Sequence, residues 1–140
     1  MAATEDLAEN KTALAKHANE LMPGLLEIPA VGPVVAATLL TAWSHRGRVR
    51  SEAAFAALAG TAPLPASSGK TVRHRLSRSG DRRLNSALDV IARVRMSRDE
   101  ATRAYVERRT SEGRTKREIR RCLKRYIARQ IYRQMWALSA

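Results

Sequence analysis

Two serines in a basic stretch are the first candidates for chemistry. Ser67 and Ser68 precede Gly69 within residues 61–80, TAPLPASSGKTVRHRLSRSG. Cationic neighbours would stabilise a serine alkoxide and a pentavalent phosphorane alike, so the arrangement suits attack on a phosphodiester. By spacing alone, residues 61–80 fit an ordinary Ser/Gly linker better than a catalytic site. The basic side chains of such a linker contact solvent or phosphate. The candidate phosphate-contacting side chains of this stretch are Lys70, Arg73, Arg75 and Arg78.

Other chemistries find little support in the sequence. A phosphate loop for ATP needs a glycine five residues before Gly69 and a preceding strand, and neither is present. One cysteine, Cys122, and three scattered histidines give no zinc ligand set. The carboxylates of the basic region show no paired spacing typical of a two-metal nuclease. We therefore expect this chain to bind no metal and no cofactor of its own.

A row of arginines at four-residue spacing marks the last expected helix. This spacing places them on one side of the helix, over about five turns. Like charges one turn apart destabilise a helix slightly, so the row is unfavourable unless an anion neutralises it. Phosphate backbone is the anion that we expect, and a membrane surface or an acidic protein is the alternative. The row is Arg117, Arg121, Arg125, Arg129 and Arg133, with Lys124 beside it.

The segment IPAVGPVVAATLL, residues 28–40, resembles a helix-hairpin-helix. In that motif a glycine-containing hairpin lets the backbone N–H groups of the second helix approach a phosphate. Gly32 fits the second hairpin glycine, and Ala30 stands where the first glycine usually is. Pro33 removes one donor, so we expect weak phosphate binding here. A plain turn that packs an apolar helix into the core is the alternative.

Helices are the elements that must position these residues. Apolar side chains recur at helical spacing in several segments, the first of which carries Leu7, Leu14, Ala18 and Leu21 on one side. No strand pair or internal repeat is present, so we predict an all-α fold. It is a compact bundle of about five or six helices containing a helix-hairpin-helix, with residues 61–80 as a long basic loop. The expected helices span residues 4–21, 34–43, 51–58, 81–94, 99–112 and 115–137.

Charge is the strongest compositional signal. The 140 residues carry a net charge of +13, and 44% of them are hydrophobic, enough for a real core. Residues 1–45 have a net charge of −3 and residues 46–140 one of +16, with arginine as 21 of the 26 basic residues. Arginine binds two phosphate oxygens at once, so nucleic acid is the first partner to expect. Without an apolar leader or a long apolar stretch, we predict a cytoplasmic, nucleoid-associated protein with no membrane partner.

Five blocks in order resemble the C-terminal half of a transposase family. In this family of insertion sequences, an N-terminal DEDD RuvC-like nuclease domain precedes a C-terminal serine-bearing domain. The blocks are IPAVGPVVAATLL, FAALAGTAP, SSGKTVRHRLSRSGDRRLNSAL, RAYVERRTSEGRTKREI and the terminal basic helix. Together they cover residues 25–138, which predicts that residues 25–140 are this C-terminal domain. Residues 1–24 would then be a helical arm at the end of the upstream linker.

The resemblance implies DNA recombination guided by a structured RNA. It places the nucleophile at Ser68, with Ser67 as the runner-up, and implies a covalent link between serine and DNA. Mg²⁺ would belong to the RuvC-like half, for which these 140 residues hold no counterpart. The implied partners are DNA, a guide RNA and the RuvC-like half, and self-association is left open. An isolated domain, a truncated element and a separate subunit all fit, and each would bind nucleic acid without completing strand exchange.

Overall fold

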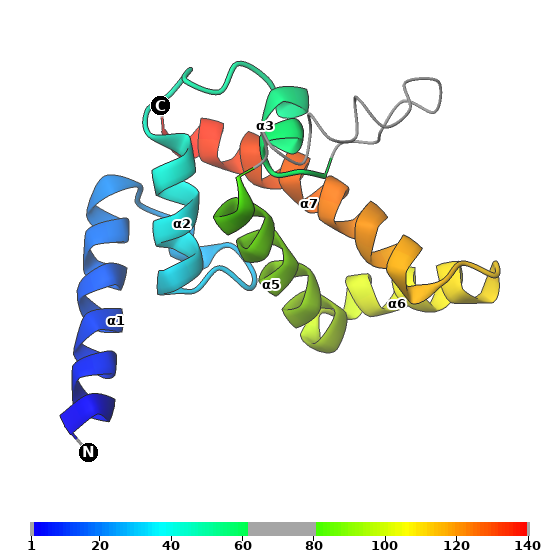
Figure 1. Cartoon of the computed structure of the whole chain (residues 1–140), viewed down its shortest axis with the longest axis horizontal. Coiled ribbons are helices and arrows are strands. Elements are labelled where there is room, and N and C mark those ends of the chain that lie inside the picture. The colour runs from blue at the N-terminus through cyan, green and yellow to red at the C-terminus, as the bar shows by residue number, and fades with distance from the viewer. Residues whose placement is uncertain (1, 62–80, 140) are drawn as a thin grey trace.

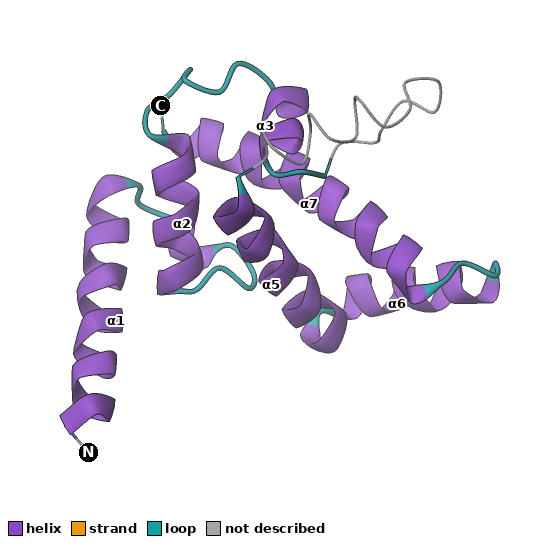
Figure 2. Cartoon of the chain, viewed as in Figure 1, coloured by secondary structure: helices purple, strands orange, loops and turns teal. Residues whose placement is uncertain are grey.

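The computed structural model describes residues 2–61 and 81–139. Within these ranges the chain forms six α-helices, one short 3-10 helix and no strand (Figures 1 and 2). The prediction of an all-α bundle is therefore confirmed. The elements are α1 (Ala2–Leu21), η1 (Leu25–Glu27), α2 (Pro33–Trp43), α3 (Glu52–Leu58), α5 (Arg82–Arg98), α6 (Glu100–Ser111) and α7 (Lys116–Leu138).

Side chains that accept hydrogen bonds from the first turn start four of the helices. Ser51 Oγ accepts from the Ala54 N–H at 3.1 Å, and Asp81 Oδ1 accepts from the Leu84 N–H at 3.0 Å. Asp99 and Thr115 cap α6 and α7 in the same way. Each cap satisfies an N–H group that the helix itself leaves without an acceptor. The sequence therefore determines where these helices begin.

The core lies along α7, which packs against α3, α5 and α6 (Figure 1). Its apolar positions recur every four residues and are buried, as are the facing positions of α5 and α2. This is the amphipathic pattern of a helix with one side in a core. The largest fully buried side chains are Phe55, Leu25, Leu39, Leu84, Leu88, Ile91, Ile119, Ile127, Ile131 and Met135.

Helix α1 leaves most of its apolar side uncovered. Ala18 is buried against the body, but Leu7 and Leu21 are 55% and 62% exposed. The apolar side of α1 is therefore exposed over most of its length. The physical reason is placement, because α1 lies along α2 and its first turns extend away from the rest of the bundle (Figure 1).

Four aromatic side chains join α2, α3 and the end of α7. The Trp43 and Tyr132 rings lie 5.2 Å apart between centroids, and Phe55 and Trp136 pack around them. The Tyr132 hydroxyl also donates to the Val49 carbonyl at 3.0 Å. This cluster fixes the C-terminal half of α7 against the connection between α2 and α3. Across the described ranges, every helix is too short or too polar to pass through a bilayer.

Candidate nucleic-acid interface

The two C-terminal arginines of the row share one carboxylate within the molecule. Arg133 Nε donates to Glu52 Oε2 at 2.6 Å, Arg133 Nη2 donates to Glu52 Oε1 at 3.0 Å, and Arg129 Nη1 lies 3.6 Å from Oε1. The hydrogen bond from Arg133 and the charges of both arginines hold the pKa of the Glu52 carboxyl below its ordinary value, against desolvation. For these two arginines the neutralising anion is a carboxylate of α3, which the sequence analysis did not foresee.

Lys124 also has partners inside the fold. Its Nζ donates to Asn85 Oδ1 at 3.0 Å and lies 3.9 Å from Asp89 Oδ1. The side chain is only 15% exposed, and burial lowers the pKa of Lys124, with Asp89 acting in the opposite direction. Asp89 is shared, because Arg93 and Arg120 of two different helices also approach it, at 3.1 and 4.0 Å. Lys124 therefore connects α7 to α5.

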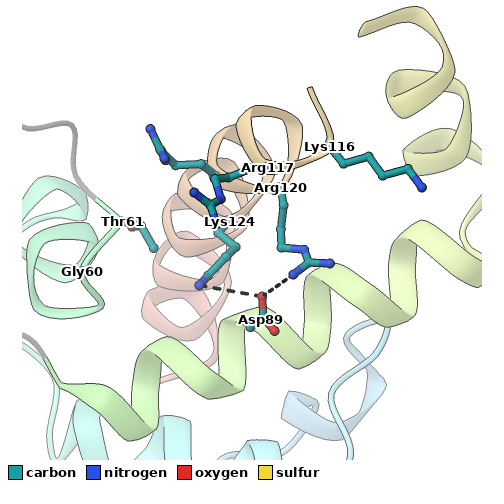
Figure 3. A pocket seen from close by; sticks show the side chains of 8 residues that line it. Gly60, Thr61, Asp89, Lys116, Arg117, Arg120 and Lys124 are labelled. Atoms are coloured by element: carbon teal, nitrogen blue, oxygen red, sulfur yellow. Dashed lines mark ion pairs between the residues drawn. The ribbon is translucent and has the colours of Figure 1, made fainter. Parts of the chain in front are cut away.

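A basic depression, here called the cationic hollow, lies at the N-terminal half of α7. Its volume is about 590 Å³. In Figure 3, Lys124 and Arg120 point toward Asp89 on the facing helix, whereas Lys116 points away from it. Among the lining side chains of the described residues, five are cationic and one is a carboxylate. The lining residues are Gly60, Thr61, Asp89, Lys116, Arg117, Arg120, Arg121 and Lys124.

Three of these cations lack a carboxylate partner. Within the described ranges, no carboxylate oxygen lies within 4.0 Å of Lys116, Arg117 or Arg121. The side chains of all three are exposed. The hollow is therefore a place where positive charge is gathered, open to solvent and largely uncompensated. Further along the row, Arg125 is half-buried, and its Nε finds no hydrogen-bond partner in the described part of the chain.

Thr61 and Asp81 flank residues 62–80 in the sequence; Thr61 lines this hollow and Asp81 is hydrogen-bonded to the end of α3. The Asp81 N–H donates to the Leu58 carbonyl at 2.6 Å, and Asn85 Nδ2 donates to the Ala59 carbonyl at 2.7 Å. Thr61, which lines the hollow, donates from its hydroxyl to the Ala56 carbonyl at 3.0 Å. The end of α3 and the start of α5 are thus held together at one point. The following predicted site residues lie outside the described residues: Ser67, Ser68, Lys70, Arg73, Arg75 and Arg78.

The turn before α2 has the backbone of a tight hairpin. Ala30 has a φ of 72°, in the left-handed region that favours glycine, at the position where the first hairpin glycine was expected. Gly32 is extended and precedes Pro33 as the N-cap of α2. A Cβ at Gly32 would meet no atom within 4 Å, so this glycine leaves the backbone of the turn open to approach. Phosphate binding at this turn stays a prediction.

Arg95 secures this turn, and the sequence analysis missed it. Its Nε and Nη2 donate to the Pro29 carbonyl at 3.3 and 3.2 Å, and its Nη1 donates to Gln130 Oε1 at 2.6 Å. Arg95 as a residue is 7% exposed, and this burial lowers the pKa of its guanidinium. Its position in the sequence could have indicated this burial, because Arg95 follows Leu88 and Ile91 at the spacing of the buried side of α5.

Comparisons with known proteins identify the family of this chain. A model of the transposase IS116/IS110/IS902 family matches residues 22–107. The insertion element IS110 uncharacterized 43.6 kDa protein of Streptomyces coelicolor is 34% identical over 100 residues. That match covers 71% of this chain and 25% of the relative, so the chain spans about a quarter of the length of this curated relative. The chain therefore belongs to the IS116/IS110/IS902 family of transposases.

Proposed function

We propose that this chain is the DNA-binding part of an insertion-sequence transposase and supplies a serine nucleophile for strand transfer. The observation that supports this most strongly is the cationic hollow, which is lined by Thr61, the residue that precedes 62–80 in the sequence. A phosphate backbone attracted to the hollow would lie close to Thr61, after which the sequence block with Ser68 follows. Positive charge at that point serves both binding and the chemistry of a phosphodiester.

Ser68 is the proposed nucleophile, by the match of its sequence block to the family. Its Oγ would attack phosphorus and lose its proton to a base, forming a serine–phosphate ester. The bond from phosphorus to one deoxyribose oxygen would break, and that oxygen would take up a proton. A cationic surrounding lowers the cost of the negative charge that develops on the phosphoryl oxygens. The residues proposed for that role are Lys70, Arg73, Arg75 and Arg78.

Mg²⁺ does not fit this part of the transposase. The ion takes carboxylate oxygens and water in octahedral geometry. The described ranges hold no group of three or more His, Cys, Asp or Glu side chains that could share an ion. The one carboxylate of the cationic hollow, Asp89, is already surrounded by cations. We therefore assign the ion to the RuvC-like half that the proposal requires as a partner.

A pair of serine variants tests the proposed role. In a strand-transfer assay that supplies the RuvC-like half, Ser68→Ala should abolish exchange and the covalent protein–DNA species. Affinity for duplex DNA should stay within about twofold, because the change removes one hydroxyl and no charge. Ser67→Ala is the matched control and should keep exchange. If Ser68→Ala retains exchange and Ser67→Ala abolishes it, the nucleophile is Ser67. If both variants retain exchange, the chain is a binding module alone.

A further inference from the structure

We propose that the phosphate backbone crosses the N-terminal half of α7 at the cationic hollow and does not follow the whole arginine row. The ligand is a polynucleotide backbone, held by Lys116, Arg117 and Arg121. This inference rests on the proposed function and makes it more specific, because it assigns binding to one half of a row that looks uniform in the sequence. Three observations support it.

The first observation is the balance of charge in the hollow. Arg120 and Lys124 share the Asp89 carboxylate, at 4.0 and 3.9 Å. The remaining three cations have no such partner in the described ranges, and residues 62–80 contain no Asp or Glu that could supply one. Unpaired positive charge that gathers in a concave site attracts an external anion most strongly. A volume of about 590 Å³ leaves room for a phosphate and its sugar.

The second observation is the spacing of the free arginines. Arg117 and Arg121 are one turn apart on an α-helix, which separates them by about 6 Å along the axis. That separation is close to the distance between neighbouring phosphates of one strand. Each guanidinium can donate two parallel hydrogen bonds to a phosphate, so the pair can hold consecutive phosphates.

The third observation concerns the other half of the row. A phosphate that approached Arg129 or Arg133 would come close to the Glu52 carboxylate, which already accepts two hydrogen bonds from Arg133. Like charges placed together oppose binding. Glu52 therefore pairs with these two arginines and joins α3 to α7. Its negative charge also repels a nucleic-acid backbone from that end of the helix.

Paired charge-removal variants of the 140-residue chain test the inference. Binding of a labelled 30-base-pair DNA duplex and of an RNA hairpin with equal phosphate number is measured by fluorescence anisotropy at several salt concentrations. Arg117→Gln with Arg121→Gln should weaken binding at least about tenfold near 50 mM salt and reduce the slope of log K against log salt by about 2. The thermal midpoint should not fall, because the change removes two like charges one turn apart. The probe with the larger loss identifies DNA or RNA as the main ligand.

Two control pairs remove the same charge elsewhere. Arg129→Gln with Arg133→Gln should lower the thermal midpoint and leave the slope within about 0.5 of the parent. Should this pair fail to fold, Arg98→Gln with Arg103→Gln, exposed on α5 and α6, serves the same purpose without disturbing Glu52. Equal slope losses in all folded pairs would overturn the inference and leave nucleic-acid binding intact. If the parent chain binds neither probe, the proposed function fails as well.

Discussion

At the scale of single residues, Arg95 has a structural role, although arginine is usually a surface residue. One guanidinium joins the turn before α2, its own helix α5, and Gln130 of α7. We expect Arg95→Met to destabilise the fold by about 1–3 kcal/mol, because the Pro29 carbonyl and the Gln130 amide oxygen lose their donors. Urea unfolding followed by circular dichroism measures the change. Arg98→Met, at an exposed position of the same helix, should stay within about 0.5 kcal/mol of the parent.

A substitution at Ala30 should instead increase the stability of the fold. Its φ of 72° is strained for a residue with a Cβ. Ala30→Gly should therefore stabilise the chain by about 0.5–1 kcal/mol, despite the greater backbone freedom of glycine in the unfolded state. Ala101→Gly, on the exposed side of α6, is the matched control and should destabilise by a similar amount. A loss of stability in both variants would show that the turn is not strained.

Among the helices, the cap of α6 gives the clearest dependence on pH. Asp99 Oδ2 accepts from the Thr102 hydroxyl at 2.6 Å and from the Thr102 N–H at 3.0 Å. These two hydrogen bonds lower the pKa of Asp99 from its ordinary value of 3.8. A lowered pKa means that the stabilisation is complete above the unfolded value and is lost as pH falls through the folded value.

The corresponding experiment compares the parent with Asp99→Asn. The difference in thermal midpoint should be largest near pH 7 and should shrink below about pH 4, where the parent carboxyl is protonated and resembles the amide. Differential scanning calorimetry at pH steps measures it. A difference that stays constant from pH 7 to pH 3 would show that the charge of Asp99 does not contribute to the cap.

Helix boundaries and the all-α class could be predicted because they depend on neighbours in the sequence. The expected helices 51–58, 81–94 and 115–137 begin at Ser51, Asp81 and Thr115, and each of these side chains accepts an N–H of the first turn. The contacts that shape the site could not be predicted from neighbouring residues in the sequence. Glu52 and Arg133 are 81 residues apart, so no local pattern indicates that one neutralises the other. The exposed apolar side of α1 likewise depends on where the helix lies and not on its periodicity.

At the scale of the whole molecule, charge is separated along the chain. Residues 46–140 have a net charge of +16, and residues 1–45 one of −3. We expect an increase from about 50 to about 200 mM salt to weaken DNA binding by about a hundredfold or more, through the release of counterions from several phosphates. Anisotropy titrations of a DNA duplex measure this. An adaptor that docks an acidic protein would bind neither duplex nor RNA even at the lower concentration.

The hydrogen bonds that join Leu58 to Asp81 and Ala59 to Asn85 close the helical body without using any residue of the 62–80 segment. These hydrogen bonds hold the end of α3 and the start of α5 together whatever the length of the insert between Thr61 and Asp81. Doubling the length of an insert costs only about 0.6 kcal/mol of chain entropy. Grafts from other family members should therefore be tolerated at this point, so that reactivity can diversify among transposases while the scaffold stays the same.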